Sequence, residues 1–329
     1  MGMNDQTTPA QAELYGHPTG LFTLFFAEMW ERFSYYGMRA LLVFYMIKSF
    51  GFADSDAYAI YGAYTALVYM TPFFGGMIAD RLLGQRSAVL LGGSLMAAGH
   101  LVMTVEYQWA FYIALGLLIV GNGFFKPNIS TIVGKIYRPG DARRDGGFTI
   151  FYMGINLGAA LAPLICGYVG ETFGWHWGFG LATVGMLIGL AVFWAPPKVA
   201  QALILGGAIF TAFLMIVVVR DKDWLFRIIY SAMALALVAS GWVAFRAVGL
   251  GGIPRHLGLA PNPEALKKPV FAGISARNAV FLGTLLTVPI FALLVSRGRH
   301  DGFIAPETIK GFMDGNIFLA TIGILLKEV

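Results

Sequence analysis

Charged residues and cysteine are scarce in this 329-residue sequence. Only 12% of its residues are charged and 57% are hydrophobic, whereas soluble globular chains carry about 25% charged and roughly 45–50% apolar residues. The single cysteine, Cys166, excludes an intramolecular disulfide, and its apolar surroundings indicate a packing residue rather than a reactive thiol. The composition therefore predicts a multi-spanning membrane protein, surrounded by the lipid bilayer.

The sequence also lacks the motifs of membrane-embedded enzymes. It contains no HExxH pair, no GxSxG, and no histidine or carboxylate cluster with the spacing of metal ligands. The net charge of +5 does not indicate a nucleic-acid partner, because the basic residues are scattered over loops, as membrane topology requires. We therefore predict no enzyme, no metal site and no binding of nucleic acid.

Apolar segments long enough to cross a bilayer follow one another in the first part of the chain. They cover residues 21–47, 57–79, 88–105, 109–133, 148–169 and 177–195. Loop arginines and lysines gather after the second and fourth segments, which by the positive-inside rule places the N-terminus in the cytoplasm. We predict a cytoplasmic tail over residues 1–20 and a six-helix transmembrane bundle over residues 21–195.

The pattern changes after Lys198. Residues 199–248 predict a helical hairpin, which turns at Arg220–Asp223, and residues 249–277 predict a basic, Gly/Pro-rich cytoplasmic connection. Residues 278–329 contain further short hydrophobic helices, of which one is expected near residues 312–326. The predicted fold class is thus an all-α membrane protein with a six-helix N-terminal bundle and additional transmembrane helices.

A charged stripe lies inside the first apolar segment. Glu28, Glu31, Arg32, Tyr35 and Arg39 recur at three- and four-residue steps, which puts them on one face of a helix. One interpretation is a buried structural ion pair. However, a charge at bilayer depth costs about 2.5–3.5 kcal/mol, so several on one face favour a water-filled cavity. There the carboxylates can exchange protons when the arginine changes its partner, which predicts a proton site coupled to a ligand site.

Lys126 is a second cation within an apolar segment, in "GNGFFKPNIS". Pro127 follows it and weakens the local hydrogen-bond ladder, a feature that cavity-lining helices tolerate. A lysine that snorkels to the membrane surface is the alternative. We expect Lys126 to pair with Glu28 or Glu31, or with a substrate carboxylate.

The loop "GGMIADRLLGQR", Gly75 to Arg86, joins the second and third segments and carries Asp80, Arg81 and Arg86. It resembles the cytoplasmic gating motif of the major facilitator superfamily. Generic charges at a membrane edge are the alternative interpretation. The resemblance implies a major facilitator-type bundle in which these three residues serve gating.

Three further motifs narrow the resemblance. "EMWERFSYYG" (Glu28–Gly37) preceded by "HPTGL", "GNGFFKPN", and "FTIFYMGINLG" (Phe148–Gly158) occur in this order. Together they resemble the proton-dependent oligopeptide transporter family, over residues 17–195. The resemblance implies a proton-coupled symporter of di- and tripeptides, in a cell membrane such as the bacterial inner membrane, that works by alternating access with protons as coupling ion and no cofactor.

The resemblance also implies roles for individual residues. Proton coupling falls to Glu28, Glu31, Arg32 and Lys126. The peptide site comprises Tyr35, Tyr36, Arg39, Tyr69, Lys126 and Asn156. The zwitterion of a dipeptide needs a cation for its carboxylate, and tyrosine rings tolerate varied side chains while offering a hydroxyl, so the chemistry of these residues agrees with the implied roles.

One part of the family pattern is not recognisable in this sequence. Family members have a second six-helix bundle, which closes the cavity from the other side, and a half-transporter cannot alternate access by rocking two bundles around a central site. Either the chain is a piece of a longer protein or it works with a partner. The alternatives are therefore a truncated, non-transporting bundle that binds peptide or a partner protein, and a family member that carries another small substrate.

Overall fold

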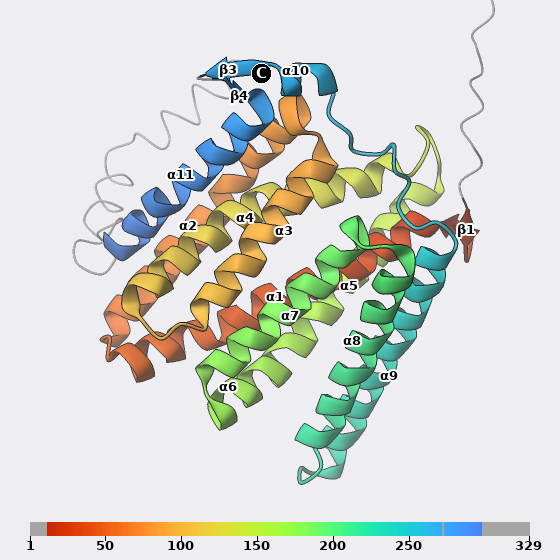
Figure 1. The fold of residues 1–329 in the computed structure, drawn as a ribbon. Coiled ribbons are helices and arrows are strands. Elements are labelled where there is room, and N and C mark those ends of the chain that lie inside the picture. The colour runs from red at the N-terminus through yellow and green to blue at the C-terminus, as the bar shows by residue number, and fades with distance from the viewer. Residues whose placement is uncertain (1–11, 272, 298–329) are drawn as a thin grey trace, which may run out of the picture.

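The computed structural model describes residues 12–271 and 273–297 and is almost entirely helical (Figure 1). The long helices are α1 (Thr19–Phe50), α2 (Asp54–Ile78), α3 (Gln85–Met103), α4 (Gln108–Lys135), α5 (Arg143–Ala162), α7 (Trp175–Trp194), α8 (Pro197–Val218), α9 (Trp224–Gly249) and α11 (Ala276–Arg297). Short elements are α6 (Tyr168–Phe173), α10 (Pro263–Lys267), and the strands β1 (Glu13–Leu14), β2 (His17–Pro18), β3 (Pro269–Phe271) and β4 (Ile274–Ser275). Residues 1–11 of the predicted tail and the predicted helix near residues 312–326 lie outside the described residues.

The prediction of an all-α membrane protein is confirmed. Among the described residues, seven helical spans are long and apolar enough to cross a membrane: α3, α4, the continuous α5–α6 segment, α7, α8, α9 and α11. Helices α1 and α2, with 32 and 25 residues, are also long enough but less apolar. In α1 the reason is the charged stripe, which places Glu28, Glu31, Arg32 and Arg39 within an otherwise apolar helix.

Helix α1 is the central helix of the molecule. It packs against α5 and α7, touches α2 and α4, and also contacts α9. The α8–α9 hairpin lies beside α1 and α7, whereas α11 lies beside α4 and α2 (Figure 1). Large apolar side chains on the outer faces of the hairpin, such as Phe213 and Trp224, are exposed. Such a surface fits a lipid environment, because water would make it costly.

Two glycines with positive φ lie at turns. Any other residue would adopt this left-handed backbone conformation only at a cost in conformational energy. Gly51, with φ 65°, ends α1, and its N–H donates to the Met46 carbonyl, as in a left-handed helix cap. Gly84, with φ 75°, ends the π-helical turn Ala79–Leu83 that continues α2. The chain can then reverse into α3 within one residue.

The connection that follows α9 folds back over one end of the bundle. The Thr19 hydroxyl donates to the Gly252 carbonyl over 3.2 Å, and the Arg86 N–H donates to the Gly258 carbonyl over 2.9 Å. A Cβ on Gly84 would lie 2.4 Å from the Leu259 carbonyl carbon, so only glycine permits this close approach. Residues 250–262 therefore rest directly on the starts of α1 and α3.

The strands β1 and β2 form a short hairpin before α1 that is tied to the loop between α4 and α5. Arg143 donates to Glu13 and Asp141 over 2.8 Å each, and the His17 ring bonds to the Tyr137 hydroxyl over 2.8 Å. The hydrogen bonds from Arg143 lower the pKa of the Asp141 carboxyl to about 2, and burial raises the pKa of Tyr137 to about 12. These contacts fix where α1 begins relative to α5.

Candidate functional site

The charged stripe of α1 forms a compact buried cluster. Glu28, Glu31 and Arg32 are 1%, 0% and 2% exposed. The Arg32 guanidinium donates two hydrogen bonds to the Glu31 carboxylate, from Nε to Oε2 and from Nη2 to Oε1, the latter over 2.6 Å. Its Nε also lies 3.3 Å from Glu28 Oε1. Glu28 Oε2 has no hydrogen-bond partner among the described residues. One arginine thus holds two carboxylates and leaves one carboxylate oxygen free.

Lys126 of α4 is a second cation within the bundle. Its amine lies 5.7 Å from the centre of the Tyr69 ring, and it forms no ion pair within the described part of the chain. The sequence predicted that Lys126 pairs with Glu28 or Glu31, or with a substrate carboxylate. Both glutamates are engaged by Arg32 instead, so the Lys126 amine remains available to an anionic ligand.

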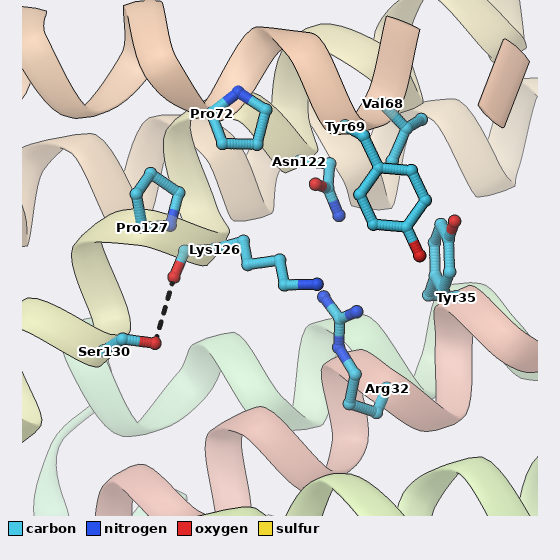
Figure 2. A pocket seen from close by; sticks show the side chains of 9 residues that line it. All are labelled: Arg32, Tyr35, Val68, Tyr69, Pro72, Asn122, Lys126, Pro127 and Ser130. Carbon is cyan, nitrogen blue, oxygen red and sulfur yellow. Dashed lines mark hydrogen bonds between the residues drawn. The ribbon is translucent and has the colours of Figure 1, made fainter. Parts of the chain in front are cut away.

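A cavity of about 340 Å³ is lined by both Lys126 of α4 and Arg32 of the cluster on α1. It is lined from α1, α2 and α4 by Arg32, Tyr35, Val68, Tyr69, Pro72, Asn122, Lys126, Pro127 and Ser130. Figure 2 shows the Lys126 amine and the Arg32 guanidinium pointing into the same space, beside the rings of Tyr35 and Tyr69. The cavity therefore combines two cations with aromatic walls, and its volume suits a small ligand.

The structure places four of the predicted site residues in this cavity and leaves others beside it. Arg32, Tyr35, Tyr69 and Lys126 line it. Tyr36 contacts the Tyr35 ring, with centroids 5.2 Å apart, and Arg39 is hydrogen-bonded to the Tyr61 hydroxyl. Asn156 is exposed on α5 and is not a lining residue.

Sequence reasoning missed the neutral polar lining residues Asn122 and Ser130. Together with Lys126 they recur every four residues on α4, and this spacing puts all three on one face. That periodicity was the available signal. It was weak because single asparagine and serine residues also occur in transmembrane helices as packing or hydrogen-bonding residues.

Helices α2 and α4 meet backbone to backbone behind the cavity. Pro127 has no N–H, so the Gly123 carbonyl lacks its usual helical donor. Gly75 of α2 lies against that carbonyl, since a Cβ there would be 2.1 Å from the oxygen. The Thr71 hydroxyl adds a hydrogen bond to the Ile119 carbonyl over 3.0 Å. Small residues thus allow the close contact that positions Lys126 opposite α1.

The predicted gating loop is connected to three other elements. Gln85 donates to Asp80 over 2.7 Å and accepts from Lys135 of α4 over 2.8 Å. The Arg86 guanidinium donates to the carbonyls of Phe193 and Pro254 over 3.4 Å each. Arg81 is exposed, and Gln85 and Lys135 are participants that sequence reasoning missed.

The fold and the charged cavity define a class, namely a membrane-embedded helical bundle of the major facilitator type. A sequence profile of the POT family, PTR2, matches residues 86–235. The chain is 46% identical over 188 residues to a di-/tripeptide transporter of Lactococcus lactis and 45% identical over 194 residues to the peptide transporter YePEPT of Yersinia enterocolitica. It is 51% identical over 189 residues to the uncharacterized transporter YclF of Bacillus subtilis.

Each of these alignments covers 55–56% of this chain and 38% of the relative. A solved peptide transporter POT in complex with sulfate matches with 43% identity and a TM-score of 0.55, covering 70% of this chain and 52% of that one. A bacterial homologue of the human drug peptide transporters PepT1 and PepT2 matches with 28% identity and a TM-score of 0.59, covering 94% and 55%. The chain therefore spans about half the length of these solved relatives.

These matches confirm the resemblance to the proton-dependent oligopeptide transporter (POT) family for the part of the chain that they cover. They also confirm the major facilitator-type fold class. The resemblance is to transporters and not to enzymes.

Proposed function

We propose that this chain forms the proton- and peptide-binding bundle of a symporter of di- and tripeptides that works by alternating access. The observation that carries the proposal is that Lys126, which has no carboxylate partner among the described residues, lines the same cavity as Arg32 of the Glu28–Arg32–Glu31 cluster. The peptide transporters among the relatives support the substrate class.

The cavity supplies the groups that a small peptide needs. Lys126 holds the carboxylate, and the Tyr35 and Tyr69 rings flank the peptide and accept varied side chains. Tyr69 is 63% exposed, so the cavity is open to the surface beside Tyr69. In this proposal Tyr36 and Arg39 of α1 and Asn156 of α5 extend the peptide site beyond the residues that line the cavity.

The charges of the cavity provide the coupling. Glu28 and Glu31 against Arg32 and Lys126 sum to zero when all are ionised. A proton that binds either glutamate leaves a net positive charge, which favours a ligand carboxylate, and it loosens the hold on Arg32. The free Oε2 of Glu28 accepts that proton without breaking an existing contact. Proton and peptide then favour each other's binding by the same free energy.

The proposed location is a bacterial cell membrane with the N-terminus in the cytoplasm. The loop charges and the bacterial sources of the curated relatives support it. Transport further requires a second bundle, in the same protein or in a partner, that closes the open side of the cavity. A potential of about 100 mV adds roughly 2.3 kcal/mol for each charge moved across the membrane.

A second candidate function is peptide binding without transport, or transport of another small substrate. Binding without transport needs only the cavity between α1, α2 and α4, which lies within the described residues. Both candidates use the same cavity. They differ in whether a proton gradient drives accumulation.

Uptake by proteoliposomes that contain the complete transporter, with the second bundle present, tests the proposal. We expect a radiolabelled dipeptide to accumulate above equilibrium when the outside is made acidic, and we expect Glu31→Gln and Lys126→Ala each to abolish this accumulation. Binding of the dipeptide without gradient-driven accumulation would support the non-transporting candidate. Accumulation that persists in both variants would contradict the proposed coupling.

A further inference from the structure

Asn122 lines the cavity, and its side-chain oxygen has no hydrogen-bond partner among the described residues. It lies on α4 one turn before Lys126 and is 2% exposed. Its Oδ1 atom makes no hydrogen bond in the described part of the chain. A buried amide without a partner costs stability, so its position in the wall of the cavity calls for a functional reason.

Asn128, on the same helix, shows how a structural asparagine behaves here. It is 1% exposed, and its Nδ2 donates to the Phe124 carbonyl over 2.7 Å and to the Gly75 carbonyl over 3.5 Å. Asn122 makes no such contact with the backbone. The packing of α4 at this height is provided by Gly121 and Gly123, whose Cβ positions would collide with α3 and α2. Asn122 is therefore not needed to join the helices.

The direction of the Asn122 side chain indicates what it binds. Figure 2 shows its amide nitrogen pointing toward the space that the Lys126 amine and the Arg32 guanidinium also face. Asn122 and Lys126 are four residues apart, so they lie above one another on one helix face. All three groups are hydrogen-bond donors, and a carboxylate, with several lone pairs on two oxygens, satisfies such a set.

We infer that Asn122 is a ligand-positioning residue that donates from its amide to the carboxylate held by Lys126. This inference rests on the proposed peptide site and adds a residue to it. A neutral donor orients the carboxylate without adding charge to a cavity whose four ionisable groups already balance. Asn122 thereby increases the preference for a free carboxylate over an uncharged carboxamide.

Binding of two matched ligands tests the inference on the full chain in detergent. The ligands are L-alanyl-L-alanine and its C-terminal carboxamide, titrated by calorimetry into wild type, Asn122→Leu and Asn122→Asp. We expect Asn122→Leu to weaken binding of the free carboxylate about tenfold or more, as expected for a hydrogen bond to a charged group, and to change carboxamide binding by less than about twofold. Asn122→Asp, which is nearly isosteric, replaces the donor by a negative charge and is expected to lose carboxylate binding altogether.

Asn128→Leu is the matched control, because it removes a buried asparagine of the same helix whose bonds are to backbone. It should lower thermal stability and leave the ratio of the two affinities unchanged. Equal weakening of both ligands by Asn122→Leu, or no weakening of either, would overturn the inference and leave the peptide site in place. A wild type that binds neither ligand would overturn the proposed function and this inference together.

Discussion

Arg32 and Lys126 are cations inside the same apolar bundle, and they differ in how they are paired. Arg32 contacts both Glu28 and Glu31, whereas Lys126 contacts no carboxylate of the described residues. An arginine that pairs with two buried carboxylates stabilises the folded bundle, because its removal leaves them unpaired. A lysine that forms no ion pair with the described carboxylates does not stabilise the folded bundle in this way.

Substituting each cation by leucine separates these two roles. We expect Arg32→Leu to lower the free energy of unfolding by about 3–5 kcal/mol, the cost of leaving buried charges without a partner. Lys126→Leu removes an unpaired cation from the interior and should leave stability unchanged or slightly raised. Thermal unfolding of both variants in one detergent measures the difference, and equal losses would contradict this assignment of roles.

The sequence predicted the charged residues of the site better than the neutral ones. Glutamate, arginine and lysine are conspicuous in apolar segments, so Glu28, Glu31, Arg32 and Lys126 could be identified from the residues alone. Which carboxylate pairs with which cation could not, because the choice between Arg32 and Lys126 depends on the separation of α1 and α4. Asn122 was missed because a buried side-chain oxygen without a hydrogen-bond partner among the described residues can be recognised only in the folded structure.

At the scale of elements, the contact between α2 and α4 sets the position of Lys126. Gly75→Ala would put a Cβ 2.1 Å from the Gly123 carbonyl oxygen, whereas Gly76→Ala would put one 3.5 Å from Pro127, an ordinary contact. We expect Gly75→Ala to destabilise the protein by about 1–3 kcal/mol, as overpacking does. Gly76→Ala should be neutral or stabilising by up to about 1 kcal/mol, because alanine favours the helix.

Thermal unfolding of the two glycine variants under identical conditions checks this prediction. Since both changes add the same methyl group to adjacent positions of α2, their helix-propensity effects cancel in the comparison. Equal melting temperatures would mean that the two helices move apart at no cost, and the close contact would then not position Lys126.

The connection over residues 250–262 is a second feature at the scale of elements. Gly84 and Gly51 both have positive φ, at 75° and 65°, so alanine at either position pays a similar backbone cost. A Cβ on Gly84 would also lie 2.4 Å from Leu259, whereas one on Gly51 meets nothing within 4 Å. We expect Gly84→Ala, and not Gly51→Ala, to release this connection from the gating loop.

Hydrogen exchange of residues 250–262 measures that release. Faster exchange in Gly84→Ala alone is the expected result. Gly84 lies next to the start of α3, where the Arg86 N–H bonds to Gly258 of the connection, and the start of α1 bonds to Gly252. Equal exchange in the two variants would show that the contact does not hold the connection. The sequence predicted a basic connection here. Its path across the gating loop depends on tertiary contacts, which the spacing of apolar residues in the sequence does not indicate.

At the scale of the whole molecule, the central claim is that one cavity binds a peptide and a proton together. The helical bundle was predictable because apolar length and loop charge report directly on membrane spans. The positions of the α8–α9 hairpin and of helix α11 in the bundle were not predictable from the sequence. They depend on contacts of α9 with α1 and of α11 with α4. The cavity lies between α1, α2 and α4, and none of its lining residues belongs to those later helices.

Proton uptake on dipeptide binding tests the central claim most directly. Binding of L-alanyl-L-alanine to the purified chain is measured in a weakly buffered solution that contains a pH indicator, with Glu28→Gln and Glu31→Gln as comparison variants. The account predicts a net uptake of protons by wild type when the dipeptide binds, and a smaller uptake in at least one of the variants. Dipeptide binding with no proton uptake, or with the same uptake in wild type and both variants, would contradict it.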